Sequence, residues 1–446
     1  LGGSATVSGF GGDVVSVTGT GIGAFADKNV QAAKPVTVSG YSLTGDEAGN
    51  YTIVQPTGVT ADITPASLTV TGLSGVSRVY NATDIAALSG TASLSGVLAL
   101  DVVTPLNTAS GTFDSKNVGT AKPITTAITL SGTDAGNYVV VQPSGLSADV
   151  TKADLAVTGV TANNRTYDST TVATLGGLAT VTGFIGDTVN VSGSGTGAFA
   201  NPNVVNVKPV TVSGFSLSGA DALNYNVLQP TGLNADITPA ALTLNAASDS
   251  RVYDGTINSS GTVTPSGLYG SDSVTGATQS FASKNVLGLN ASTLQVNAGY
   301  IVNDGNGGNN YTLTTNTAAG TITPAALTIS TTSVNRVYDT TQNAAGSAIV
   351  TGGMLYVTDT ISGGTFQFAS KNAGTNVTVN VSGVTVNDDN AGNNYAVTYA
   401  ANNTSNITKA DLVVTGVTAN SRVYDSTTIA GLGGAATVTG LVGDVV

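Results

Sequence analysis

An internal repeat of about 86 residues constrains the fold of this chain more than any other feature of its sequence. An Arg-x-Tyr motif occurs five times, with 85 to 87 residues between successive tyrosines: Arg78–Tyr80, Arg165–Tyr167, Arg251–Tyr253, Arg336–Tyr338 and Arg422–Tyr424. At 446 residues the chain is also too long for one domain of the usual ~100–200 residues. The repeat therefore predicts a tandem array of small modules.

Four further motifs recur with the same period. The phenylalanine of a Phe-x-x-Lys-Asn motif lies at Phe25, Phe113, Phe199, Phe281 and Phe368, although the third copy lacks the lysine. An Asn-Tyr pair ends at Tyr51, Tyr138, Tyr225, Tyr311 and Tyr395. A closing Thr-Pro-Ala or Thr-Lys-Ala begins at Thr64, Thr151, Thr238, Thr323 and Thr408. An aspartate recurs at Asp13, Asp101, Asp187, Asp272, Asp359 and Asp444.

Cutting the chain after each closing alanine gives four full modules and two partial ones. The full modules are 67–153, 154–240, 241–325 and 326–410, and the partial modules are 1–66 and 411–446. Because Leu1 aligns with Leu175 and Val446 with Val189, both ends fall inside a module. We expect the chain to be a segment of a longer array. The alternative is that the structural unit is cut differently from the sequence unit.

Short stretches within each module alternate between apolar and polar residues, which is the period of half-buried β-strands. In the module 154–240, Val210 and Val212 fall on one face and Thr211 and Ser213 on the other. Similar stretches are 155–158, 179–182, 188–192, 225–228 and 235–238. Gly, Asn and Asp lie between them and favour turns. Six or seven such strands in about 86 residues predict an all-β chain of tandem, Ig-like β-sandwich modules with Greek-key connections.

Two other folds stay open. A β-grasp-like module would add one small helix, at Ser169–Leu175. A continuous β-solenoid fits less well, because its coils usually repeat every ~20–30 residues.

The modules follow one another with almost no linker. The junction Ile237–Leu242 reads as one strand running into the next, and Pro65, Pro239 and Pro324 restrict the backbone there. We therefore expect a semi-rigid rod in which each module contacts its neighbours in the same chain.

The composition excludes several classes of function. The net charge is −12, and the few basic residues are scattered, so no nucleic-acid partner is expected. No stretch of 18 or more apolar residues could span a bilayer as a helix. The chain has no His and no Cys, which removes imidazole bases, thiolate nucleophiles and the usual zinc ligands. We expect no enzymatic activity, and we assign no catalytic, cofactor-binding or metal-binding residue.

The recurring aromatic and arginine residues are interpreted as structural. All five Arg and most Tyr and Phe lie in the repeated motifs, so we expect the aromatic side chains to anchor each module's core. An exposed aromatic stripe that stacks on glycans is the alternative. The arginines are expected to pair with carboxylates, for example Arg165 with Asp187 or Asp168.

Two further hypotheses concern the polar motifs. Asp- and Asn-rich loops precede the Asn-Tyr pair, most clearly at 303–310 and 387–394, and calcium favours such oxygen ligands. Turn formation explains the same residues, so calcium is only an alternative here. The Lys-Asn pair raises the idea of a covalent amide cross-link, but the third copy reads Asn201-Pro202-Asn203. A cross-link in every repeat is therefore not expected.

Several phrases resemble a known family. Arg251–Gly255, Phe281–Val286, Ala135–Tyr138 and Ala61–Ala66 are similar to the YDG-type repeats of large bacterial adhesins, which are filamentous-haemagglutinin-like proteins often exported by two-partner secretion. Only Tyr253-Asp254-Gly255 is a complete Tyr-Asp-Gly. The resemblance implies an extracellular stalk with no catalytic residues.

The leading functional hypothesis is thus a structural stalk, extender or fibre segment of a secreted or surface-bound bacterial adhesin. It would give reach and attach cells to surfaces or to a biofilm matrix. Two alternatives remain: a multivalent repeat that binds a glycan or host protein, and a filament that assembles from other copies of the chain through sheet edges.

Overall fold

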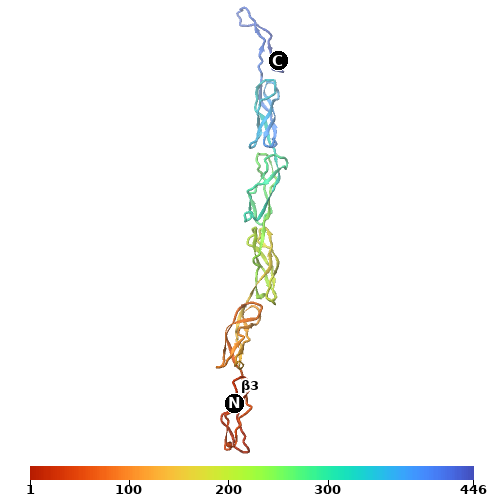
Figure 1. Cartoon of the computed structure of the whole chain (residues 1–446). Coiled ribbons are helices and arrows are strands. Elements are labelled where there is room, and N and C mark those ends of the chain that lie inside the picture. The colour runs from red at the N-terminus through yellow and green to blue at the C-terminus, as the bar shows by residue number, and fades with distance from the viewer. The chain divides into compact units, whose positions relative to one another are not determined.

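The computed structural model describes residues 1–446 and is all-β, as the sequence predicts. Its only helical elements are single 3₁₀ turns, η1 (Ala48–Asn50), η2 (Ala135–Asn137) and η3 (Ala222–Asn224), and Figure 1 shows strands and loops along the chain. The helix of the β-grasp alternative is not formed, since Ser169–Leu175 contains a short strand instead. No helix is long and apolar enough to cross a membrane.

The chain forms two compact units. Unit 1 comprises Leu1–Asn163, Val172–Ala200 and Pro209–Asn234. Unit 2 comprises Asn164–Thr171, Asn201–Lys208 and Ala235–Val446. The division passes through the repeat 154–240, so this repeat contributes segments to both units.

The first two repeats contain fourteen strands. Segment 1–66 has β1 (Ser16–Thr18), β2 (Ile22–Phe25), β3 (Gln31–Ser39), β4 (Ser42–Thr44) and β5 (Thr60–Ile63). Repeat 67–153 has β6 (Ala66–Gly75), β7 (Arg78–Val79), β8 (Ile85–Ser95), β9 (Thr104–Leu106), β10 (Ser110–Phe113), β11 (Gly119–Thr125), β12 (Thr129–Ser131), β13 (Tyr138–Val141) and β14 (Ser147–Thr151).

The next two repeats contain twenty strands. Repeat 154–240 has β15 (Ala153–Ala156), β16 (Thr158–Ala162), β17 (Arg165–Thr166), β18 (Val172–Ala173), β19 (Leu175–Thr180), β20 (Asn190–Ser192), β21 (Thr196–Phe199), β22 (Val205–Ser213), β23 (Ser216–Ser218), β24 (Tyr225–Leu228) and β25 (Asn234–Thr238). Repeat 241–325 has β26 (Ala240–Asn245), β27 (Ser250–Val252), β28 (Thr264–Ser266), β29 (Ser273–Thr275), β30 (Gln279–Phe281), β31 (Ser292–Val296), β32 (Ile301–Asn303), β33 (Tyr311–Asn316) and β34 (Ala318–Thr323).

The remaining strands lie toward the C-terminus. Repeat 326–410 has β35 (Ala325–Thr331), β36 (Asn335–Val337), β37 (Ala348–Gly353), β38 (Thr360–Phe368), β39 (Gly374–Asn387), β40 (Tyr395–Tyr399) and β41 (Asn402–Thr408). Segment 411–446 has β42 (Val414–Thr415), β43 (Thr418–Ala419), β44 (Leu432–Gly433) and β45 (Thr437–Val438).

The strand pairing repeats with the sequence. In every full repeat the first strand pairs in parallel with the strand that starts at the Asn-Tyr tyrosine, as β6 does with β13 and β35 with β40. The arginine strand pairs in parallel with the closing strand, as β7 does with β14 and β36 with β41. The other pairs are antiparallel, so the sheets are mixed. They differ in this from the antiparallel sheets of an immunoglobulin sandwich.

Repeat 326–410 shows the two-layer arrangement most clearly. One sheet has the order β37-β35-β40 and the other the order β36-β41-β39-β38. Leu327 and Ile329 of the first sheet share one buried cluster with Val381, Val384 and Val386 of the second. The two sheets therefore pack face to face around an apolar core, as predicted for a sandwich.

The alternation in the sequence corresponds to burial. In β22, Val210 and Val212 are buried while Thr211 and Ser213 are exposed. The recurring aromatic residues of the full repeats are also core residues, with Tyr253 and Phe281 fully buried and Tyr338 partly buried against its core cluster. The prediction that they anchor each module is confirmed.

Paired glycines explain part of the high glycine content. Gly159 and Gly177 adopt φ of +77° and +78° where the register between β16 and β19 shifts. A Cβ at Gly177 would lie 2.1 Å from the carbonyl oxygen of Gly159. Because neither the close approach nor the positive φ suits an L side chain, this bulge requires glycine.

Candidate functional site at the repeat junctions

The most regular polar site lies where one repeat meets the next. The recurring aspartate accepts hydrogen bonds from two tyrosines, one in the preceding repeat and one in its own. In unit 1, Tyr80 and Tyr225 both donate to Asp187, with oxygen–oxygen distances of 2.8 and 2.6 Å. In unit 2, Tyr253 and Tyr395 both donate to Asp359 at 2.8 Å. We call this arrangement the Tyr-Asp-Tyr clamp.

The clamp recurs with nearly constant spacing. The tyrosine of the preceding repeat precedes its aspartate by 105 to 107 residues: Tyr80 to Asp187, Tyr167 to Asp272, Tyr253 to Asp359 and Tyr338 to Asp444. Each of these contacts lies within one unit. A repeat therefore completes the hydrogen bonding of its predecessor's buried tyrosine.

The clamp perturbs the pKa values of its members. Burial, reinforced by the hydrogen bond to the aspartate, raises the pKa of Tyr167 and of Tyr225 to about 12. For Asp187, burial opposes ionisation, but hydrogen bonds from Lys116, Tyr225 and Tyr80 outweigh it and lower the pKa. The clamp thus consists of neutral phenols around a carboxylate, which is the arrangement that gives strong, charge-assisted hydrogen bonds.

A second contact joins the repeats beside the clamp. The side-chain oxygen of Asn224 accepts the backbone N–H of Val118 at 3.0 Å, and its amide nitrogen donates to Asn117 at 3.0 Å. The same two bonds link Asn137, Asn310 and Asn394 to the preceding repeat. This explains why asparagine precedes tyrosine in every Asn-Tyr pair, because one amide supplies both a donor and an acceptor.

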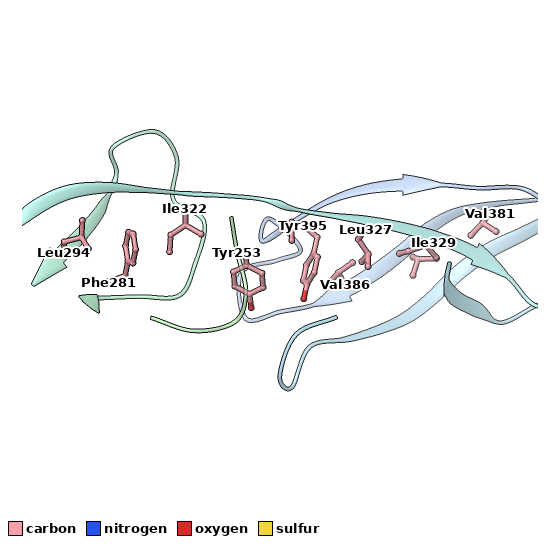
Figure 2. Packing of buried hydrophobic residues seen from close by; sticks show 11 residues of the cluster. Tyr253, Phe281, Leu294, Ile322, Leu327, Ile329, Val381, Val386 and Tyr395 are labelled. Atoms are coloured by element: carbon pink, nitrogen blue, oxygen red, sulfur yellow. The ribbon is translucent and has the colours of Figure 1, made fainter. Parts of the chain in front are cut away.

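Apolar packing is continuous across the junction. Tyr253 packs edge-on against Tyr395, with ring centroids 5.4 Å apart, and also contacts Tyr356 at 5.8 Å. Figure 2 shows Tyr253 and Tyr395 side by side, with Phe281 toward one end of the row and Ile329 toward the other. One buried cluster therefore spans repeats 241–325 and 326–410. Such edge-to-face pairs contribute about 0.5–1.5 kcal/mol beyond area burial.

The lysine of the Phe-x-x-Lys-Asn motif adds an ion pair to some junctions. The Lys116 ammonium lies 2.5 Å from a carboxylate oxygen of Asp187 and 2.8 Å from one of Asp221. Hydrogen bonds to these two carboxylates raise the pKa of Lys116. The lysine thus meets carboxylates and not the side chain of Asn117, so the geometry gives no support to a Lys-Asn cross-link.

The recurring arginines stabilise the turn that carries the clamp tyrosine. Arg165 pairs with Asp168 at 2.7 Å and donates to the hydroxyl of Thr170 at 2.8 Å. Arg251 lies over the ring of Phe281, 5.6 Å from its centroid, where cation–π attraction applies. Of the two partners proposed for Arg165, Asp168 is confirmed. The Asp187 carboxylate instead accepts hydrogen bonds from two tyrosines and a lysine.

The Asn-rich loops are closed by their own carboxylates. Asp388 is buried and accepts the backbone N–H groups of Asn390, Gly392 and Asn394 at 2.7 to 2.9 Å. Asp304 does the same in the preceding repeat, and its backbone hydrogen bonds lower its pKa against the opposing effect of burial. No group of three or more acidic side chains is arranged to hold a metal ion. Turn formation explains these loops, and calcium binding stays only an alternative to it.

The members of the clamp are visible in the sequence, but their pairing is not. Spacing alone allows the recurring aspartate to pair with an arginine as readily as with a tyrosine. The recurring tyrosines and aspartates have the same period in the sequence. This shared period is the signal that each tyrosine could meet an aspartate in the next repeat along the chain.

Comparison with known families agrees with this architecture. The sequence model of one family, described as the YDG domain, matches residues 1–59, 64–145, 151–232, 238–318 and 323–404. Each of the four later matches begins within three residues of a repeat defined by the motifs. A search of curated protein sequences finds no match.

Proposed function

The chain belongs to the YDG domain family, and on that premise we propose that it is a non-catalytic stalk or extender segment of a secreted or cell-surface bacterial adhesin. The observation that carries the proposal is the clamp, because it joins successive repeats through buried, fully partnered polar groups. A spacer needs such joints so that each repeat is held by the next, as in other repeat proteins with nearest-neighbour coupling.

The tight connection between repeats supports the same proposal. β25 ends at Thr238 and β26 begins at Ala240, so one proline separates two strands. Ala240 then donates its backbone N–H to Asn310 at 3.0 Å. Because the linker is a single residue, we expect restricted reorientation of adjacent repeats.

The mechanical part of the proposal can be tested by small-angle X-ray scattering. Deleting residues 154–240 from the full chain removes one repeat. The recurring residues of the remaining repeats keep their spacing. We expect the maximum dimension to fall by roughly 30–40 Å, the length of a ~10-residue strand. A control variant with a flexible Gly-Ser insertion after Pro239 should scatter as a jointed chain. An unchanged maximum dimension after the deletion would refute an extender.

The location of the protein needs a separate test. Antibodies raised against the chain should label intact cells of the source bacterium, or its culture medium. Labelling that requires permeabilised cells would contradict a secreted or surface-bound segment, while leaving the scattering result unaffected.

A further inference from the structure

Repeat 326–410 contains a cleft of about 710 Å³ on the open side of its sandwich. The cleft lies between β39, whose C-terminal part pairs only with β38, and β40, which pairs only with β35. Its lining, which is mostly polar, includes Val386, Asn387, Asp389, Val397 and Tyr399. This volume falls within the ~300–1,000 Å³ of typical small-ligand sites.

Tyr399 is the side chain that distinguishes this cleft. Its hydroxyl accepts the backbone N–H of Val384 at 3.0 Å and lies 3.4 Å from the carbonyl oxygen of the same residue. The residue is nevertheless 42% exposed. The hydroxyl of Tyr399 is thus fixed by the backbone of Val384, while part of the side chain remains exposed to solvent.

The first three repeats, up to residue 240, perform the same bridging with glutamine. Gln229 accepts the N–H of Phe215 at 3.1 Å and donates to its carbonyl at 2.8 Å. Gln55 and Gln142 bridge their own repeats in the same way. Because an amide is sufficient for the fold, the aromatic ring at 399 is not required by it. The ring is an additional surface facing the cleft.

The rim supplies a hydrogen-bond acceptor. Asn387 donates its amide N–H groups to Thr360 and Ser362, so its side chain lies on the exposed face of β39, opposite to Val386. The Asp389 side chain is 86% exposed, and its nearest cation, Lys284, lies 3.9 Å away. The buried Asp388 holds the intervening loop through three backbone N–H groups. Such preorganisation lowers the entropic cost of binding.

We propose that this cleft binds a neutral oligosaccharide. The apolar C–H face of a sugar ring would stack on Tyr399, and sugar hydroxyls would donate to the carboxylate oxygens of Asp389. Acidic glycans are disfavoured by Asp389 and by the net charge of −12. An added peptide strand is also disfavoured, because Tyr399 already occupies the Val384 N–H that it would need. The site goes beyond the proposed extender function, which does not depend on it.

The test uses the full chain and defined probes. Cellohexaose, chitohexaose and mannohexaose serve as neutral probes and a heparin hexasaccharide as the acidic one, with binding followed by saturation-transfer NMR and titration calorimetry. We expect saturable binding of at least one neutral probe and none of heparin. Tyr399→Gln, which copies the earlier repeats and retains the bridge, should weaken binding about tenfold or more.

The controls separate loss of the site from loss of the fold. Tyr399→Gln should leave the circular dichroism melt unchanged, and Gln229→Asn, a rim-distant variant in another repeat, should leave binding unchanged. The proposal is overturned by the absence of saturable binding to every neutral probe. It is also overturned by binding that Tyr399→Gln does not affect, or by binding of heparin alone.

Discussion

The repeats of the N-terminal half and those of the C-terminal half build the same junction with different auxiliary contacts. In unit 1, a 3₁₀ turn precedes the Asn-Tyr pair, and Lys116 bridges Asp187 and Asp221 at 2.5 and 2.8 Å. In unit 2, an Asn-rich loop replaces the turn, and Lys284 lies 3.8 and 3.9 Å from its carboxylates. The third copy of the motif has Pro202 in place of the lysine.

This difference separates the essential contacts from the replaceable ones. The Tyr-Asp-Tyr clamp and the asparagine contact occur in both units. The lysine pair and the loop vary, and the buried carboxylates of Asp304 and Asp388 stabilise the loops of unit 2 through backbone N–H groups. We infer that buried hydrogen bonds from tyrosine hydroxyls to a carboxylate define the junction and that the lysine ion pair only supplements them.

Removing a clamp aspartate should lower the local free energy of unfolding more than any other change considered. Asp187→Ala leaves two buried hydroxyls without their acceptor and leaves Lys116 paired with Asp221 alone. We therefore expect the local free energy of unfolding to fall by about 3–5 kcal/mol. Asp359→Ala should cost less, because Lys284 is held more loosely. Hydrogen exchange of peptides covering β24 and β40 in the full chain measures both. Equal losses of local stability in the two variants would contradict the expected difference between the junctions of the two units.

Removing the loop aspartate should have the next largest effect on local stability, and a larger one in unit 2 than in unit 1. Asp388→Ala removes the acceptor of three backbone N–H groups, and each buried donor left unpaired costs about 1–3 kcal/mol. Asp221→Ala, the matched change in unit 1, removes the acceptor of one backbone N–H, that of Thr188, and should cause a smaller loss of stability. The readout is exchange protection in the strand after each loop. A larger loss at Asp221 would show that the ion pair, and not the loop, carries the stability.

Removing a single clamp hydroxyl should affect the two units alike. Tyr80→Phe and Tyr253→Phe each delete one hydrogen bond to a carboxylate while retaining the ring, so we expect about 1.5–3 kcal/mol at each site. Thermal melts and local exchange report the change. A clear difference between the two variants would mean that the clamp is not the constant part of the junction.

The clamp also predicts a pH range of full stability. The pKa of Asp187 is lowered from 3.8, so its contribution is present above about pH 4 and is lost as the pH falls further. The pKa of Tyr225 is raised to about 12, so its contribution is present below about pH 10 and is lost as the pH rises toward 12. Circular dichroism melts across pH and tyrosinate absorbance check both limits. Complete tyrosine ionisation at pH 10 with the fold intact would contradict the clamp.

The smallest effect is expected from the lysines. Lys116→Met should cost about 1 kcal/mol or less, because its ammonium is partly exposed to solvent and salt. Lys284→Met should change stability less still. Repeating the melts at high salt should reduce the difference between Lys116→Met and the unchanged chain, whereas a salt-independent loss would indicate a packing role for the lysine stem.

Much of this architecture could be predicted from residue spacing. The period, the all-β class and the structural role of the aromatic residues follow from recurring motifs and from alternation such as Val210 and Val212. The pairing of Arg165 with Asp168 follows because charges three residues apart in a turn are neighbours.

Other features depend on contacts between distant residues. The parallel pairing of β35 with β40 leaves no mark in a period-2 pattern, because parallel and antiparallel strands alternate in the same way. The bridging role shared by Gln229 and Tyr399 was also hidden, since an amide and a phenol look unrelated until both are seen on the same backbone atoms.

The sequence by itself determined that one module is repeated, which residues recur in it and that their alternation forms sheets, because these are local and periodic properties. Only the tertiary structure decided which recurring residues meet. Asp187 could pair with an arginine of its own repeat or with a tyrosine 107 residues earlier, and both fit the spacing. Packing across the junction selects the tyrosine, since it buries the ring and brings its hydroxyl to the carboxylate.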